Sequence, residues 1–140
     1  MHVKHRFIPG RVWLLLLLAC SLCGCTVKKM DAEKLRDVEF TVVKKEEIPE
    51  ELKEQIKEAR TTPMKLTYGD GGYLYIARGY GEQKTTGYSI AVEAVYETAD
   101  AICIQSELKG PSKEEEILKK KTYPYVVVKI EYSDKQVVFE

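Results

Sequence analysis

Cysteine and histidine offer the most versatile side-chain chemistry in this sequence, because thiolates and imidazoles serve as nucleophiles, general bases and zinc ligands. The 140 residues contain four cysteines and two histidines. All of them except Cys103 lie within the first 25 residues. What the chain can do chemically therefore depends on the role of its N-terminal segment.

The first 25 residues have the three parts of a secretory signal. Lys4, Arg6 and Arg11 make its start basic. An apolar run with five consecutive leucines follows up to Ala19, and small residues end the segment as CSLCGC. The apolar run is well short of the roughly 20 apolar residues that span a bilayer. We therefore expect export of the chain.

The end of this segment, LCGC at residues 22–25, resembles a lipobox, where bacterial lipoproteins receive a diacylglyceryl thioether with acyl chains such as palmitate. This modification needs a thiol at the cleavage point and small residues before it. We predict a signal peptide over 1–24, lipidation of Cys25 and a polar tether over 25–37. The product would be a lipoprotein on the extracytoplasmic face of the cell membrane. The sequence LLAC fits the same pattern at Cys20, and a plain secretory signal is a further alternative.

Removal of residues 1–24 changes which kinds of catalysis are available. No histidine would remain, which excludes Ser-His-Asp and Cys-His catalysis and the usual imidazole zinc sites. Cys103 would be the one thiol besides Cys25, and its apolar neighbours predict a buried structural cysteine without a disulfide. Ser89 lies in GYSI, which is not the G-x-S-x-G turn of a hydrolase. We predict no enzyme, no cofactor and no metal, although a pair of carboxylates acting on a sugar would leave no visible pattern.

The charge balance argues against nucleic acid as a partner. The chain has 22 basic and 22 acidic residues, and loss of Lys4, Arg6 and Arg11 leaves 19 basic residues. A nucleic-acid interface needs a concentrated basic surface, which this composition does not indicate.

The rest of the chain predicts one domain over 38–140 that is α+β and mainly β. Residues 46–60 read as an amphipathic helix with Pro49 at its first position and an apolar stripe of Leu52, Ile56 and Ala59. Alternating or apolar runs predict strands at 38–42, 64–68, 73–78, 88–97, 101–108, 122–132 and 136–139. We expect an antiparallel sheet or a small sandwich of about six strands under the helix. Short links predict antiparallel hairpins for 64–78, 88–108 and 122–139.

Two segments between these strands remain open to interpretation. Residues 110–121 contain Ser112 and Glu115 at capping-box spacing, which favours a short helix, but an extended charged loop is the alternative. The segment EQKTTGY at 82–88 is either a structural turn, in which Gly87 supplies a conformation that a Cβ forbids, or a recognition loop with exposed threonines. Both interpretations of residues 82–88 can hold together.

The same region carries a family resemblance. GYGEQKTTGYSIAVEAVYETADAICI, then GPSKEEE, KKTYPYVVVKI and a terminal VVFE resemble the C-terminal domain of the protease complex subunit PrcB family, over about 74–140. The resemblance marks, by position, Gly81, Glu82, Thr85, Gly87, Tyr88, Pro111, Thr122 and Pro124. This chain has Thr86 where the family often has glycine. Membership implies an accessory lipoprotein and a protein partner, such as a surface serine protease.

A second resemblance gives the alternative function. TTGY at 85–88 is similar to the core of one inhibitory loop in chagasin-like cysteine-protease inhibitors, whose other two loop motifs have no good match here. We therefore expect a non-catalytic, protein-binding accessory subunit, with protease inhibition as the alternative. The predicted binding residues are Glu82, Thr85, Thr86, Gly87, Tyr88, Pro111, Tyr123 and Pro124.

Overall fold

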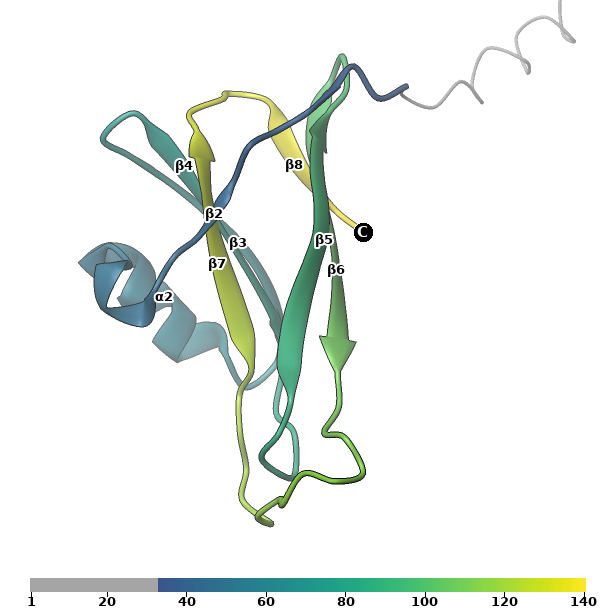
Figure 1. Ribbon diagram of the computed structural model, residues 1–140. Helices are drawn as coiled ribbons and strands as arrows, with labels where there is room; N and C mark the ends of the chain where they lie inside the picture. Colours follow the sequence, from purple (N-terminus) through teal and green to yellow (C-terminus); the bar gives the residue numbers. More distant parts are fainter. Residues whose placement is uncertain (1–32) are drawn as a thin grey trace, which may run out of the picture. The chain divides into compact units, whose positions relative to one another are not determined.

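The computed structural model describes residues 33–140, so the predicted signal peptide, Cys20 and Cys25 lie outside the described residues. Figure 1 shows the elements in sequence colours. In chain order they are β1 (Arg36–Asp37), β2 (Thr41–Val42), the 3-10 helix η1 (Lys45–Glu47), α2 (Glu50–Ala59), β3 (Pro63–Asp70), β4 (Tyr73–Tyr80), β5 (Ser89–Glu97), β6 (Ala101–Lys109), β7 (Tyr125–Glu131) and β8 (Gln136–Phe139). Within 33–140, neither helix has the length and apolar character needed to cross a bilayer.

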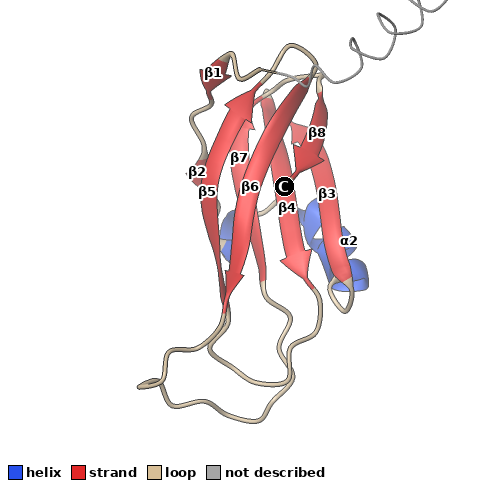
Figure 2. Ribbon diagram, turned by 90° about the vertical axis from the view of Figure 1, so that its right-hand side faces the viewer, coloured by secondary structure: helices blue, strands red, loops and turns tan. Residues whose placement is uncertain are grey.

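The strands form two four-stranded sheets that face each other (Figure 2). One sheet has the order β1-β5-β6-β8, with antiparallel pairs except for the parallel pair of β6 and β8. The other has the order β2-β7-β4-β3 and is antiparallel throughout. The predicted fold class, mainly β with one packed helix, is confirmed, and the arrangement is the sandwich.

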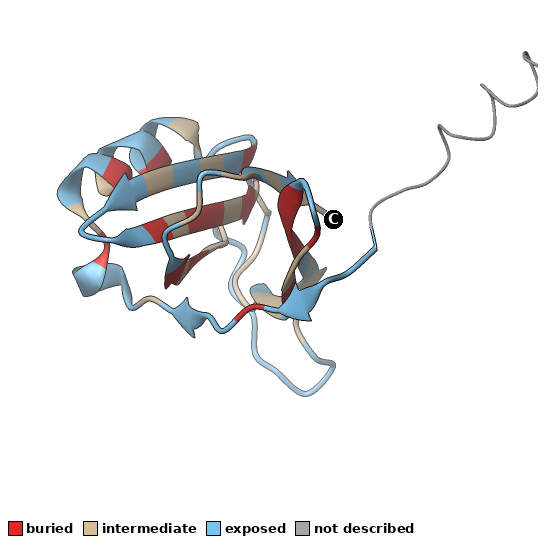
Figure 3. Ribbon diagram, turned by 90° about the horizontal axis from the view of Figure 1, so that it is seen from above, coloured by how far each residue is buried: buried red, intermediate tan, exposed pale blue. Residues whose placement is uncertain are grey.

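The core lies between the two sheets, and a second apolar layer lies under the helix. Alternate residues of β4 serve the two layers: Ile76 belongs to the core between the sheets and Ala77 to the cluster with α2. Leu52 and Ile56 of α2 are almost fully buried in that cluster. The sheet that contains β4 is therefore covered on both faces, while the outer side of α2 and the long loops stay exposed (Figure 3).

Two of the three predicted hairpins are present. β3 and β4 pair from Pro63↔Tyr80 to Asp70↔Tyr73 around a turn of Gly71 and Gly72, both with positive φ, as a tight hairpin requires. β5 and β6 form the second hairpin. The third prediction was wrong, because β8 leaves β7 and pairs in parallel with β6 in the opposite sheet. In that place Val137 and Phe139 pack against the core between the sheets.

The predicted strand at 38–42 and the predicted helix also differ in detail. The segment crosses from one sheet to the other: β1 pairs with β5, and β2 pairs with β7. Val38 lies between them and is buried in the core, whereas Phe40 and Val42 of the same alternating pattern are exposed. The predicted helix at 46–60 is divided into η1 and α2, because Pro49 has an extended conformation and precedes the first turn of α2.

Candidate functional site

Two loops lie side by side at one end of the sandwich (Figures 1 and 2). They are the β4–β5 loop, residues 81–88, and the β6–β7 loop, residues 110–124, and we call them the loop cluster. Gln83 and Thr122 form an antiparallel bridge with backbone hydrogen bonds of 2.8 and 3.0 Å. The Thr86 N–H donates to the Leu118 carbonyl at 3.1 Å. Backbone hydrogen bonds therefore hold the two loops together, although neither loop forms a strand.

Threonine hydroxyls add a second set of links between the loops. The Leu118 N–H donates to Thr86 Oγ1 at 2.9 Å, and Thr122 Oγ1 donates to the Thr85 carbonyl at 2.7 Å. Thr85 Oγ1 donates to the adjacent Thr86 carbonyl at 3.0 Å. The interpretation of 82–88 as a recognition loop took these threonines to be exposed, but Thr85 and Thr86 are half-buried and take part in these bonds, as the interpretation as a structural turn expects.

Gly87 is a position where the loops approach closely. Its φ is +95°, and a Cβ there would lie 2.6 Å from Pro111 Cβ. Side chains avoid this conformation, and such a distance is far inside van der Waals contact. The predicted turn at Gly87 is thus present, and it serves the contact between the two loops.

A polar cluster joins the loops to the end of α2. Tyr123 Oη donates to Glu82 Oε1 at 3.4 Å, and Lys121 Nζ lies 3.8 Å from Glu82 Oε2. The Arg60 guanidinium stacks over the Tyr123 ring at 4.7 Å. Arg60 and Lys121 were missed from the sequence, because their partners Tyr123 and Glu82 are distant along the chain.

The tip of the β6–β7 loop is the most exposed part of the cluster. Residues 112–120 are all exposed and contain no helix, so the extended charged loop is the correct alternative. A turn replaces the helix: the Ser112 N–H donates to Glu115 Oε1 at 3.2 Å. Ile117 is 45% and Leu118 65% exposed. The tip therefore presents two large apolar side chains to solvent from an anchored backbone.

The structure brings all eight predicted binding residues to this end of the molecule. Glu82 is exposed, and the other seven are half-buried. Tyr88 lies against Gly110, which would place a Cβ 3.5 Å from the Tyr88 ring. The Pro124 carbonyl accepts from the Tyr80 N–H at 3.3 Å and so fixes the start of β7. The loop cluster therefore combines polar and apolar side chains on one surface.

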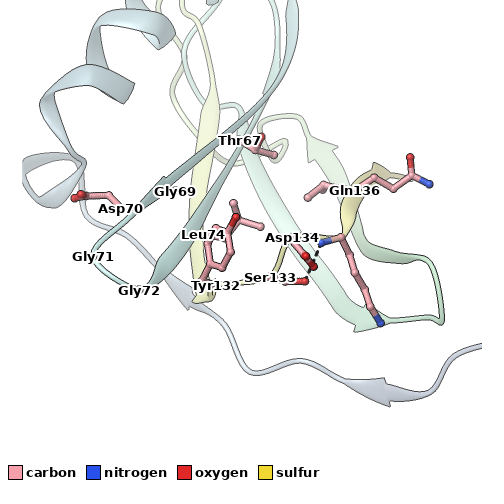
Figure 4. A pocket seen from close by; sticks show the side chains of 12 residues that line it. Thr67, Gly69, Asp70, Gly71, Gly72, Leu74, Tyr132, Ser133, Asp134 and Gln136 are labelled. Carbon is pink, nitrogen blue, oxygen red and sulfur yellow. Dashed lines mark hydrogen bonds between the residues drawn. The ribbon is translucent and has the colours of Figure 1, made fainter.

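Two features of the described residues bear on catalysis: possible metal ligands and grooves lined by carboxylates. Among residues 33–140, no three His, Cys, Asp or Glu side chains lie close enough to bind a metal together. An open groove of about 750 Å³ lies between the β3–β4 turn and residues 132–137 (Figure 4). Asp70 and Asp134 come from different walls of this groove, and the marked hydrogen bond is local, from the Lys135 N–H to Ser133 Oγ at 3.2 Å. We see no paired acid and base in it.

Cys103 is buried on β6 and is a free cysteine, as the sequence predicted. It lies opposite Tyr96 in the register of β5 and β6. The Tyr96 hydroxyl donates to Glu140 Oε1 at 2.8 Å. This hydrogen bond, together with burial and the neighbouring Cys103, raises the pKa of Tyr96 to about 12. These groups are held in a structural contact at the middle of the sheet, away from the loop cluster.

Comparison with known proteins gives a match for one part of the chain. Residues 74–131 match the family model described as PrcB C-terminal. The resemblance expected from the sequence is confirmed over this range, which contains both loops of the cluster. No curated protein and no solved structure matches the chain.

Proposed function

From the premise that residues 74–131 are a PrcB C-terminal domain, we propose that the protein is a non-catalytic accessory subunit of a surface protease complex. In this proposal Cys25 carries the lipid anchor and the loop cluster binds the protease. The observation that carries the proposal is the family match itself, because it spans 81–88 and 110–124 together.

The placement of the loop cluster supports a role in binding. β1 and the turn between β5 and β6 lie at the opposite end of the sandwich (Figures 1 and 2). A chain that leads from a lipid at Cys25 enters the domain at that far end. About ten tether residues reach at most roughly 35 Å. The loop cluster would then point away from the membrane, where a partner is accessible.

The chemistry of the site supports a role without turnover. Histidine occurs in this sequence at His2 and His5 alone, both inside the predicted signal peptide. The single cysteine of the described domain is buried. By contrast, the exposed Ile117 and Leu118 on a fixed backbone are the kind of apolar anchor that protein interfaces use.

Copurification from native membranes tests the partner. The full-length chain with a C-terminal tag should retain a serine protease in constant ratio after detergent extraction. A well-folded lipoprotein that retains no protein would overturn the proposal. Inhibition of a papain-type protease by the purified chain, without a retained subunit, would favour the chagasin-like alternative.

Membrane fractionation tests the anchor. Replacement Cys25→Ser should release the protein from the membrane fraction, because two or three acyl chains, at about 0.8 kcal/mol per buried methylene, provide the stable attachment. Release by Cys20→Ser with full retention of Cys25→Ser would place the lipid at Cys20.

A further inference from the structure

The charged residues of α2 are sorted into two rows. Lys53, Lys57 and Arg60 follow one another at i, i+4 and i+7 and therefore share one side of the helix. Glu51, Glu54 and Glu58, at i, i+3 and i+7, form a second row beside it, and Glu50 lies between the two rows. Lys53 and Lys57 are a like-charged i, i+4 pair, which destabilises an isolated helix.

The basic row borders a groove of about 450 Å³ beside α2. Its lining contains four cationic side chains and a single carboxylate, together with buried Ile56 and the half-buried ring of Tyr125: Lys45, Glu46, Lys53, Ile56, Lys57, Arg60 and Tyr125. Lys45 Nζ lies 5.0 Å above the Tyr125 ring. Within 33–140 the ion pairs of this row are confined to Lys53, whose Nζ is 3.4 Å from exposed Glu50. The groove therefore holds positive charge that the described domain does not neutralise.

The groove is continuous with the loop cluster. Arg60 lines its end and stacks on Tyr123, which in turn donates to Glu82. A partner that contacts the loop cluster thus reaches the groove without leaving the surface.

We propose that this basic groove binds an acidic segment of the protein partner, with carboxylates on Lys53 and Lys57 and an apolar side chain toward Ile56. This inference rests on the proposed function and adds the chemistry of the partner. The concave shape and the apolar floor fit a peptide better than they fit the surface of a membrane, and the chain enters the domain at the far end of the sandwich.

A peptide titration on the full-length lipoprotein in a neutral detergent tests this site. The probe is a labelled Glu-Glu-Leu-Glu-Glu-Leu peptide, and its counterpart Lys-Lys-Leu-Lys-Lys-Leu is the control. The acidic probe should bind, the basic one should not, and a salt increase from about 0.05 M to about 0.5 M should weaken binding strongly because the charges are at the surface. Charge reversal by Lys53→Glu with Lys57→Glu should weaken it by about tenfold or more.

The acidic row supplies the matched variant. Glu54→Lys with Glu58→Lys changes the charge of the same helix by the same magnitude and with the opposite sign, at positions that do not line the groove. It should leave binding of the acidic peptide nearly unchanged, and equal thermal melting of all variants excludes unfolding as a cause. Equal effects of the two double variants, or no binding of the acidic peptide, would overturn the proposal.

Two further outcomes distinguish this proposal from a lipid-binding groove and from the proposed accessory function. If vesicles with phosphatidylglycerol bind through Lys53 and Lys57 while the peptide does not, the groove is a lipid site and the proposal is wrong. If a protease copurifies equally with wild type and with the Lys53/Lys57 variant, the accessory function stands and the groove has no part in it.

Discussion

At the scale of single residues, the conformation and the packing at Gly87 both require glycine. We expect Gly71→Ala to cost about 1–2 kcal/mol, because Gly71 has positive φ but open space around it. Gly87→Ala should cost about 1–3 kcal/mol more, because its Cβ would also meet Pro111. Urea unfolding of both variants measures the difference. If both variants lose the same free energy of unfolding, the contact between Gly87 and Pro111 contributes nothing to stability.

Cys103 gives a second prediction at this scale. The residue is 6% exposed near the start of β6, so its thiol should react slowly with an alkylating reagent in the native protein and quickly in denaturant. Mass spectrometry of the peptide that contains Cys103 follows the reaction, with Ser112→Cys as an exposed control. Rapid native labelling of Cys103, at the rate of the control, contradicts the burial.

Single residues were predictable where the cause is local. A glycine directly before an alternating strand indicated the turn at Gly87, and apolar neighbours indicated the burial of Cys103. The role of Thr86 was not predictable, because its partner Leu118 is 32 positions away. Nothing near Thr86 in the sequence distinguishes a hydroxyl that binds another loop from one that faces solvent.

At the scale of elements, the loops should act as one unit through Thr86. Thr86→Ala removes the acceptor of the Leu118 N–H, which is worth about 0.5–1.5 kcal/mol. Since Leu118 is exposed, water can accept from its N–H in the variant, and the free energy of unfolding should change little. The clearer effect should be faster hydrogen exchange of the Leu118 amide, by up to about tenfold. Thr86→Ser should restore protection, and Thr85→Ala should leave the Leu118 amide unchanged. Unaltered exchange in Thr86→Ala would show that the backbone bridge suffices.

A second contact between elements predicts a pH dependence. Glu97 on β5 accepts from Lys135 Nζ and binds Arg36 Nε, both at 2.6 Å, and so ties β1 and the β7–β8 link to one strand. The hydrogen bond from Lys135, with Arg36 adding to it, lowers the pKa of Glu97 below its ordinary value of 4.5. The lowered pKa means that the folded state favours the carboxylate. The resulting stability is present above pH 4.5 and is lost as pH falls through the lowered pKa.

The variant Glu97→Gln should therefore be less stable than wild type at neutral pH, and the difference should vanish in acid. Thermal melts as a function of pH measure it. Glu107→Gln is the control, because that carboxylate is 55% exposed and lies 4.0 Å from Lys109. A constant difference between Glu97→Gln and wild type at all pH values would contradict the assigned role.

Turn residues and periodicity predicted the strands and their local hairpins. They did not predict pairing between strands that are distant in the sequence. The two-glycine turn specifies the β3–β4 hairpin, and the close spacing of β5 and β6 specifies the next one. β8 has a short link to β7 but pairs with β6, because Val137 and Phe139 complete the core there. A short link between two strands therefore does not show that they pair, because the second strand can pair in the other sheet if its apolar side chains pack better there.

At the scale of the whole molecule, the proposed function gives the two ends of the domain different roles. β1 lies at one end, and the opposite end carries the loop cluster, with the basic groove adjoining it through Arg60 and Tyr123. The sequence indicated the residues of the cluster through a family resemblance, but it did not place them at the end of the sandwich opposite β1. That placement follows from the strand order, which the sequence left open.

Site-specific photocrosslinking in native membranes tests the central claim, that a protease binds at the loop cluster, most directly. A photoreactive amino acid at Leu118, 65% exposed at the loop tip, should crosslink to one protease subunit. The same amino acid at exposed Asp100, in the β5–β6 turn at the opposite end, should not. Crosslinking of the protease from Asp100 alone, or equally from both positions, would contradict the account.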